Sequence, residues 1–340
     1  MGNRELANDN GGKGMGKGNG TVPNCALSLS LAHSCSLGCP GPRSPFHFPV
    51  SKAGIVTVAG RPNSGKSTLL NRIIGQKLSI VSPKPQSTRD RVVGILTIAD
   101  VQMVILDTPG LMDPAYELQR AMRATALRAL RDADVIIHLA DATQGAPQPL
   151  HVEAGLAAPP QAPIVLALNK SDQISVLARQ ALEQTGGTFV AALTGDGVSD
   201  LIKRCAGMLP ESPFLYPEDE ISSQSMRFFV AELVRETALE QLGDEVPYSV
   251  ACEVEEFREG SSPLYIRAGL FVERDSQKRI IIGAEGARIR EIGQAARIKI
   301  ERLVGGPVYL DLWVKVLANW RKSASALARF GYQVNEETNK

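Results

Sequence analysis

The stretch Gly60-Arg61-Pro62-Asn63-Ser64-Gly65-Lys66-Ser67 fits the pattern G-x-x-x-x-G-K-S/T, which defines a phosphate-binding loop. The apolar run Ile55–Ala59 precedes it and predicts a buried strand, and Lys66–Ile74 follows it with helical spacing. Its glycines let the backbone curl so that amide groups face phosphate oxygens at the positive end of a helix. A chance glycine loop is the alternative, but the flanking strand and helix argue for a nucleotide site in an α/β fold.

Short apolar runs separated by helix-like stretches continue beyond this loop. Their alternation predicts a mostly parallel sheet that is covered by helices on both faces. Two runs within Gly94–Asp107 are nearly contiguous, which predicts a hairpin and one antiparallel edge strand. The predicted strands are Ile55–Ala59, Gly94–Ala99, Met103–Leu106, Val135–Ala140, Ile164–Leu168 and Phe189–Leu193, and the predicted helices include Lys66–Ile74 and Glu117–Arg131.

The composition is that of a globular chain: 340 residues, 44% hydrophobic, with a formal net charge of +1. This length predicts two domains, and the hydrophobic share excludes general disorder. No window holds about 18 consecutive apolar residues, which argues against a spanning helix. Five cysteines are too few for a disulfide framework, so we expect a reducing compartment. Near-neutrality, taken alone, argues against a nucleic-acid partner.

Three prolines, Pro210, Pro213 and Pro217, mark a change of domain, after which the order of elements differs. A helix, two strands, helices and a strand then predict a separate, smaller α+β domain. The predicted elements there are the helix Arg227–Leu242, the strands Tyr248–Phe257 and Leu264–Glu273, the helical stretch Ala287–Leu303, the strand Val308–Val316 and the helical tail Trp320–Phe330. The predicted division is an extension over 1–50, a first domain over 51–215, a linker over 216–226, a second domain over 227–318 and a tail over 319–340.

The extension contains nine glycines, and such a composition predicts a disordered tail. A targeting segment or a misassigned start codon are the open explanations for it. Cys25, Cys35 and Cys39 lie there without a matching fourth ligand, which makes them a weak zinc signal.

Downstream residues specify the chemistry of the phosphate site. We expect Lys66 to reach the β- and γ-phosphates and Ser67 to offer its hydroxyl to Mg²⁺. The run Asp107-Thr108-Pro109-Gly110 ends a predicted strand, so that Asp107 is placed to hold Mg²⁺ through water and the Gly110 amide to bond the γ-phosphate.

A polar loop, Pro85-Gln86-Ser87-Thr88-Arg89-Asp90, lies between a predicted helix and a predicted strand. A threonine in such a loop closes over Mg²⁺ when the γ-phosphate is present and is released after hydrolysis. We expect Thr88 rather than Ser87 to take this role.

The run Asn169-Lys170-Ser171-Asp172 ends another predicted strand at the same edge of the sheet. The Asp172 carboxylate is suited to accept both N1–H and N2–H₂ of guanine, a pair that adenine does not offer. We expect Asn169 to face the N7/O6 edge and Lys170 to lie over the ring. The alternative is an ordinary capped helix start. A backbone amide within Ala191-Ala192-Leu193 would meet the guanine O6.

These motifs resemble the translation-factor-class GTPases, and among them the Era family. The resemblance covers about 51–330 and rests on G-R-P-N-x-G-K-S-T-L-L-N at Gly60–Asn71 and on P-Q-x-T-R at Pro85–Arg89. One departure from the family is Ala191, where the family usually has serine. Leu111 is as in the family, and it stands where Ras-like enzymes have a water-orienting glutamine. The resemblance implies slow GTP hydrolysis, with Asn63 matching an asparagine that helps to hold K⁺; a loop-structuring role for Asn63 is equally open.

The resemblance also implies roles residue by residue. Catalysis is expected from Asn63, Lys66, Thr88 and Gly110, and Mg²⁺ binding from Ser67, Thr88 and Asp107. The expected nucleotide contacts are Gly60, Arg61, Pro62, Asn63, Ser64, Gly65, Lys66, Ser67, Thr68, Asp107, Thr108, Pro109, Gly110, Leu111, Asn169, Lys170, Ser171, Asp172, Ala191, Ala192 and Leu193.

The second domain contains Gly283-Ala284-Glu285-Gly286 after the apolar run Ile280–Ile282, which is read as a strand end, and before a helix. This G-x-x-G and the order of elements look like a type II KH module, whose loop lets a nucleic-acid backbone approach closely. Residues 278–302 carry seven basic and three acidic side chains, a local charge of +4 that the chain average hides. The expected RNA contacts are Ile282, Gly283, Ala284, Glu285, Gly286, Arg288 and Arg290.

The sequence therefore predicts an α/β P-loop GTPase domain followed by a type II KH domain, with GTP or GDP, Mg²⁺ and K⁺ as cofactors. The resemblance implies binding to the 3′ end of 16S rRNA during 30S maturation, as a cytoplasmic monomer with peripheral association with the inner face of the membrane. A signalling GTPase with a protein or membrane partner is one alternative. A metabolic P-loop kinase is another, which the guanine motif argues against.

Overall fold

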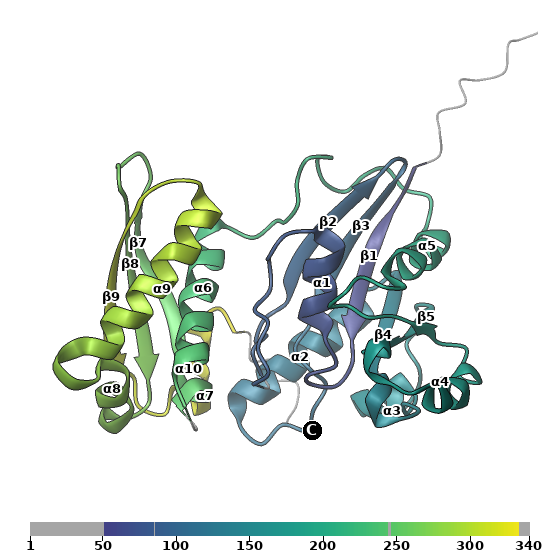
Figure 1. Ribbon diagram of the computed structural model, residues 1–340, viewed down its shortest axis with the longest axis horizontal. Coiled ribbons are helices and arrows are strands. Elements are labelled where there is room, and N and C mark those ends of the chain that lie inside the picture. The colour runs from purple at the N-terminus through teal and green to yellow at the C-terminus, as the bar shows by residue number, and fades with distance from the viewer. Residues whose placement is uncertain (1–50, 85, 244–245, 333–340) are drawn as a thin grey trace, which may run out of the picture. The chain divides into compact units, whose positions relative to one another are not determined.

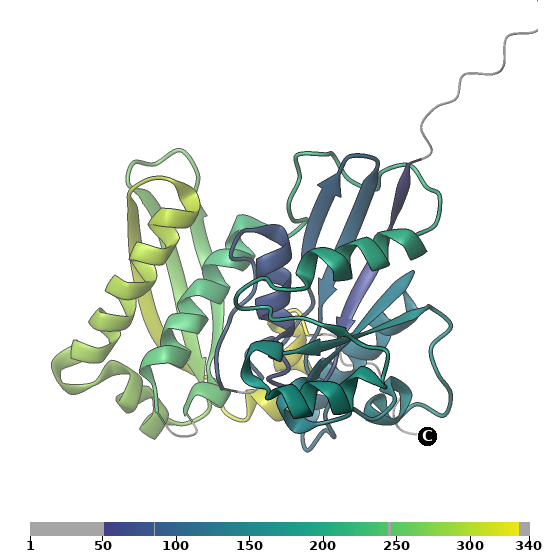
Figure 2. The same ribbon diagram turned by 45° about the vertical axis from the view of Figure 1, so that its right-hand side comes forward.

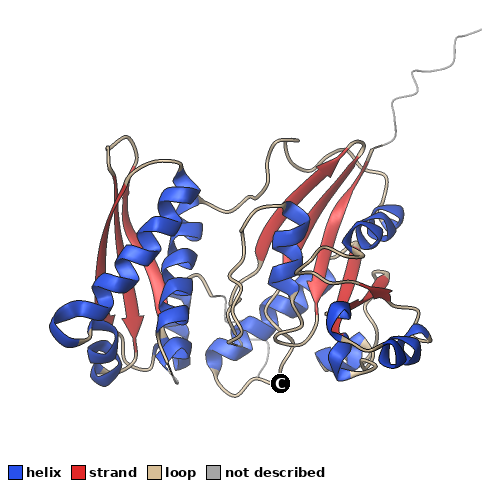
Figure 3. Cartoon of the chain, in the orientation of Figure 1, coloured by secondary structure: helices blue, strands red, loops and turns tan. Residues whose placement is uncertain are grey.

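The computed structural model of the chain describes residues 51–84, 86–243 and 246–332, all within one compact unit. Two sheets and the helices packed on them organise these residues (Figures 1 and 3). Predictions for the extension 1–50 lie outside the described residues. Within the described ranges, no helix is long and apolar enough to cross a membrane.

The first sheet has six strands in the order β2-β3-β1-β4-β5-β6. All neighbours pair in parallel except β2 and β3, which form an antiparallel hairpin at one edge. This confirms the predicted mostly parallel sheet with one antiparallel edge strand. Its elements are β1 (Lys52–Ala59), α1 (Lys66–Ile74), β2 (Val92–Ile98), β3 (Val101–Asp107), α2 (Glu117–Arg131), β4 (Val135–Asp141), α3 (Leu150–Ala154), β5 (Ile164–Asn169), α4 (Val176–Glu183), β6 (Thr188–Phe189) and α5 (Val198–Met208).

Alternate residues of each strand point to opposite faces of this sheet, and both faces are buried. Val56 and Val58 of β1 pack with the apolar side chains of α1 and α5. On the other face, Ala59 and Ile136 pack with α2 and α3. Figure 2 shows α5 and α1 in front of the same face of the sheet. The carboxyl ends of β1, β3, β4 and β5 consequently meet at one edge, where the predicted motifs lie.

The last strand of this sheet is shorter than predicted. The sequence predicts a strand over Phe189–Leu193, but β6 ends at Phe189. The chain turns there, because Ala191 N donates to Asp196 O at 2.9 Å and Gly195 N donates to Ala191 O at 2.7 Å. The predicted guanine-side run Ala191–Leu193 is therefore a turn and not the end of a strand.

The second sheet has three strands in the order β7-β8-β9, with β8 antiparallel to β7 and parallel to β9. Helices α6, α8 and α9 cover one face, with Val234, Ile266 and Ile300 among the buried contacts. The elements are α6 (Met226–Gln241), α7 (Val246–Ser249), β7 (Ala251–Arg258), β8 (Leu264–Val272), α8 (Asp275–Ile282), α9 (Ala287–Val304), β9 (Val308–Val316) and α10 (Ala324–Arg329).

Two predictions in the second domain are wrong. The run Ile280–Ile282 is the last turn of α8 rather than a strand end, with Gly283 N donating to Arg279 O at 2.9 Å. Three consecutive isoleucines favour a strand, but Gln277 stabilises the start of the helix by accepting from Glu273 N and Arg274 N. The predicted strand over Tyr248–Phe257 begins later, at Ala251, because Tyr248 belongs to the single turn α7.

Apolar side chains from both halves of the described chain share two clusters. Phe229 of α6 packs in the cluster of α1 and the first sheet. Trp320, which is fully buried, packs with Leu118 and Met122 of α2 and with Phe271 of β8.

Candidate functional site

The phosphate-binding loop joins the end of β1 to the start of α1 (Figure 1). Gly65 has a φ of 97°, and a Cβ there would lie 2.2 Å from Nδ2 of Asn169, so only glycine fits. The buried Lys66 ammonium donates to the carbonyl oxygens of Gly60 at 3.2 Å and Arg61 at 2.7 Å. Burial lowers the pKa of Lys66 to about 8. A cation and a helix N-terminus therefore meet at this loop, which is an arrangement that binds phosphate.

The back of the loop is tied to α3 by a charged contact that the sequence does not reveal. Arg61 Nε lies 3.2 Å from Glu153 Oε1, and Glu153 Oε2 lies 3.1 Å from His138 Nε2. Both Glu153 and His138 are 5% exposed in their side chains. No spacing rule connects these three positions, because only the sheet brings α3 beside the loop.

The three predicted magnesium ligands come together. Ser67 Oγ lies 2.8 Å from Thr88 Oγ1 and donates to Asp107 Oδ2 at 2.7 Å, and Thr88 Oγ1 lies 3.4 Å from the same carboxylate oxygen. Asp107 is fully buried, and its Oδ1 has no hydrogen-bond partner among the described residues. Burial raises the pKa of Asp107, an effect opposed by the Ser67 hydroxyl. Two hydroxyls and a buried carboxylate with a free oxygen fit Mg²⁺.

The loop after β3 approaches the phosphate-binding loop directly. A Cβ on Gly110 would lie 2.7 Å from Pro62 N, and Leu111 N donates to Gly60 O at 3.0 Å. Leu111 is buried. Asn63, with a φ of 61°, donates from Nδ2 to Pro83 O at 3.2 Å and so connects the loop to the segment that carries Thr88.

The predicted role of Asn169 differs from its observed contacts. The sequence predicts that Asn169 faces the guanine N7/O6 edge, but Nδ2 donates to Ser64 O at 2.7 Å and Oδ1 accepts from Ala192 N at 2.9 Å. Because both amide atoms bond to protein, this buried side chain joins the phosphate-binding loop to the guanine-side turn.

The other residues that the sequence predicts to contact guanine follow Asn169 in the chain or lie in the turn that it bonds. Lys170 has a φ of 60°, and its ammonium lies 2.6 Å from Asp141 Oδ2 at the end of β4. The Asp172 side chain is exposed, and no hydrogen bond or ion pair occupies it within the described ranges. Arg72 of α1 donates to the carbonyl oxygens of Ala192 and Leu193. Asp141 and Arg72 are further positioning residues, and neither belongs to a motif that sequence reasoning uses.

A cleft of about 370 Å³ connects these parts. It is lined by the phosphate-binding loop, by residues 80–83 and 86–88, and by Thr108, Gly110 and Lys170. Thr68, another predicted nucleotide contact, also lines the cleft. Pro109 is buried next to Thr108 in the chain, and Ser171 N donates to Val190 O at 3.1 Å. The geometry therefore gathers phosphate, metal and base determinants at one edge of the sheet.

In the second domain, the G-x-x-G sequence forms the tight turn between α8 and α9. Gly283 has a φ of 73°, and a Cβ there would lie 2.8 Å from Arg288 Cβ. Glu285 is exposed and adopts a φ of 49°, and Arg288 and Arg290 are exposed in the first turn of α9. The turn thus presents backbone and two guanidinium groups to solvent, with one carboxylate between the glycines.

Comparisons with known proteins agree with this geometry. Residues 55–170 match the family described as 50S ribosome-binding GTPase, and residues 245–321 match the KH domain family. The chain is 41% identical to the GTPase Era of Carboxydothermus hydrogenoformans over 292 residues, which cover 83% of this chain and 98% of that protein. It is 43% identical to the GTPase Era of Ectopseudomonas mendocina over 304 residues, 84% of this chain and 98% of that protein.

Two solved structures of Era are also similar, each at 38% identity over 83% of this chain and 99% of the other. One is a variant of Aquifex aeolicus Era bound to GDP·AlF₄⁻, with a TM-score of 0.77. The other is Era in complex with MgGDPNP and nucleotides 1506–1542 of 16S ribosomal RNA, with a TM-score of 0.78. Both the predicted fold and the predicted resemblance are therefore confirmed, and the chain belongs to the Era family of GTPases.

Proposed function

We propose that this GTPase is a nucleotide-controlled switch that binds the 3′-end region of 16S rRNA and assists maturation of the 30S subunit. One observation carries the proposal: a guanine-nucleotide cleft and an exposed G-x-x-G turn with Arg288 and Arg290 occur in the same chain. A KH turn of this kind accommodates about four unstacked bases beside the backbone contact. The related Era that binds nucleotides 1506–1542 of 16S rRNA supports the choice of RNA.

Fluorescence anisotropy with a labelled single-stranded oligonucleotide of the 16S rRNA 3′ end tests the proposal. The full chain is titrated in GDPNP and in GDP, with a scrambled oligonucleotide as the specificity control. We expect the double variant R288A/R290A to bind about tenfold more weakly, because each arginine faces solvent beside the turn. The matched control R131A removes an exposed arginine of α2 and should bind like the unaltered protein. Absence of binding in both nucleotide states would favour a protein or membrane partner instead.

In the proposed GTP site, Lys66 contacts the phosphates, Gly110 contributes its amide, and Ser67, Thr88 and Asp107 hold Mg²⁺. The bound metal supplies charge neutralisation at the β- and γ-phosphates. The gathering of the two hydroxyls around the Asp107 carboxylate supports this assignment. Asp172 reads guanine, and Lys170, held by Asp141, lies over the base.

We propose K⁺ as an assisting cation held partly by Asn63. Its position between the phosphate-binding loop and Pro83 O supports a site where loop carbonyls and an asparagine meet. Hydrolysis rates in KCl and NaCl at equal ionic strength test it. Faster hydrolysis in KCl, lost in N63A, is the expected result. Equal rates in the two salts would leave Asn63 with its structural contact alone.

We further propose a cytoplasmic monomer that associates peripherally with the inner face of the membrane, with the domain division 1–50, 51–215, 216–226, 227–318 and 319–340. The family resemblance supports the location, and the change from the first sheet to the second supports the division. Co-flotation of the full chain with anionic vesicles tests the membrane association, and failure to float with them would contradict it.

A further inference from the structure

The residue before Thr88 is held by an arginine of the second domain. Arg235 lies on α6 and is 2% exposed. Its Nη2 donates to Ser87 O at 2.5 Å, and its Nη2 and Nε donate to the two carboxylate oxygens of Glu232 at 2.6 and 2.8 Å. A guanidinium fixed by its own helix neighbour thus reaches the backbone of the segment that carries Thr88.

The residue after Thr88 is Arg89, and here the first domain supplies the arginine and the second domain supplies the acceptors. The Arg89 guanidinium, 3% exposed as a residue, donates to Val250 O at 2.6 Å and to Tyr248 O at 2.9 Å. Its carbon atom lies 5.6 Å from the centroid of the buried Trp320 ring. Both neighbours of Thr88 are therefore bonded to the second domain through buried arginines.

These contacts matter because Thr88 itself lies at the metal ligands of the first domain. Its hydroxyl is 2.8 Å from Ser67 Oγ and 3.4 Å from Asp107 Oδ2, and the side chain is buried. We propose that Arg235 is a positioning residue of the GTP reaction, which with Arg89 fixes the backbone around Thr88 so that its hydroxyl stays beside Ser67 and Asp107. This inference rests on the proposed Mg²⁺–GTP site.

The energetics favour one position of the segment. A buried guanidinium is costly unless carbonyl or carboxylate oxygens satisfy its N–H groups. Movement of Ser87 and Arg89 relative to the second domain would remove the acceptor of Arg235 and separate the Arg89 guanidinium from the carbonyls of the second domain. Since Thr88 is needed at the metal only when a γ-phosphate is present, the arginine contacts should favour GTP over GDP.

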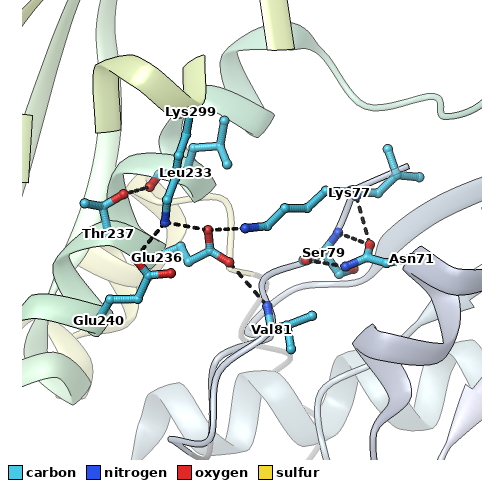
Figure 4. A network of polar contacts seen from close by, with 10 residues as sticks. Asn71, Lys77, Ser79, Val81, Leu233, Glu236, Thr237, Glu240 and Lys299 are labelled. Carbon is cyan, nitrogen blue, oxygen red and sulfur yellow. Dashed lines mark hydrogen bonds and ion pairs between the residues drawn. The ribbon is translucent and has the colours of Figure 1, made fainter. Parts of the chain in front are cut away.

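A second interdomain contact provides a matched control. Figure 4 shows the buried Glu236 carboxylate of α6 between Lys77 and Lys299, at 2.6 and 3.1 Å, and accepting from Val81 N at 3.4 Å. This network joins the same two domains, but Lys77 lies eleven positions before Thr88 and contacts neither of its neighbours. Replacement of Lys77 therefore weakens the interface without touching the residues beside Thr88.

The test uses the full chain and compares R235M, R235K and K77M. For each we would measure Kd for GDP and for GDPNP in Mg²⁺, the Mg²⁺ concentration that half-saturates hydrolysis, and kcat and KM separately. In R235M we expect about tenfold weaker GDPNP binding and a raised Mg²⁺ requirement, with GDP affinity within about twofold of the unaltered protein. R235K keeps one donor for Ser87 O and should recover part of the loss, and K77M should bind both nucleotides normally.

Unchanged GDPNP affinity and Mg²⁺ requirement in R235M would overturn the inference, as would an equal loss in K77M. If R235M does not fold, R89M approaches the same segment from the first domain and must show the same selective loss. The proposed function fails separately, because in that case the unaltered chain would not bind guanine nucleotides in Mg²⁺ at all.

Discussion

Among single residues, Asp172 is the one that we propose distinguishes guanine from adenine. Its side chain is exposed and has no hydrogen bond or ion pair within the part of the chain that the structure describes, and the neighbouring Lys170 ammonium pairs with Asp141 instead. In D172N, the new amide N–H group faces the N2 amino group of guanine, which also donates, whereas xanthine has a carbonyl oxygen that accepts at that position. We expect GTP affinity to fall by about 100-fold or more and XTP affinity to rise. Competition of labelled GDP by GTP and XTP measures this, and unchanged GTP affinity would refute the base assignment.

Lys66 gives the nucleotide-free protein a specific dependence of stability on pH. Burial lowers its pKa from 10.5 to about 8, so between these values the unfolded state binds the proton and the folded state does not. Stability from this group therefore rises with pH across that window. From about pH 7.5 to 9.5 the free energy of unfolding should increase by about 2 kcal/mol more in the unaltered protein than in K66M. Urea unfolding at the two pH values measures the difference, and equal increases would contradict it.

At the scale of elements, regular strand and helix patterns were predictable and local turns were less so. The helices Lys66–Ile74 and Glu117–Arg131 and the strand Val308–Val316 have the predicted ends. The sequence misplaces Ile280–Ile282, since β-branched residues favour a strand until tertiary packing buries one face of a helix. It also extends the last strand of the first sheet, because the turn that ends β6 depends on Asp196 O.

Site residues in motifs were likewise predictable from the sequence, and those outside motifs were not. Motif residues such as Ser67 and Asp107 are recognisable because their motifs follow β1 and β3 at one sheet edge, and Thr88 is recognisable in the polar loop before β2. Asp141 contacts Lys170 and Glu153 contacts Arg61, but neither carboxylate belongs to a motif itself. Only the fold therefore shows these contacts. The second role of Asn169, as a bridge between two loops, likewise requires both loops in place.

The turn between α8 and α9 carries a prediction of its own. Glu285 places a negative charge where the phosphate backbone of RNA would approach. E285K should tighten RNA binding and steepen by about 1 the slope of the logarithm of the binding constant against the logarithm of the salt concentration. The substitution changes the charge by two units, and each phosphate contact on a single strand contributes about 0.7 to this slope. The control E259K changes an exposed glutamate in the β7–β8 hairpin, at the opposite end of this domain from α8 (Figure 1). Equal slopes for E285K and the unaltered protein would place the RNA backbone elsewhere.

At the scale of the whole molecule, polar and apolar contacts join the two domains, and two of the polar contacts involve the residues beside Thr88. Arg89 and Arg235 secure the backbone beside Thr88, and Glu236 joins Lys77 to Lys299 of α9 (Figure 4). Since α9 begins at the G-x-x-G turn, these contacts connect the segment after α1 to the helix that carries Arg288 and Arg290. A change in nucleotide state therefore has a physical route to the second domain.

Because these contacts join the two domains, we expect the domains to unfold together. We expect them to unfold independently when the apolar contact at Trp320 is removed. Trp320 is fully buried, packs with Leu118 and Met122 of α2, and donates from Nε1 to Ser249 O at 2.8 Å. W320A should cost about 3–5 kcal/mol and split one unfolding transition into two, of which only the first domain's shifts with added GDP. The other tryptophan, Trp313, is 54% exposed, so W313A should change stability by less than about 0.5 kcal/mol. A single GDP-sensitive transition in W320A, close in midpoint to that of W313A, would contradict the prediction, because the two domains would then still unfold together without this joint.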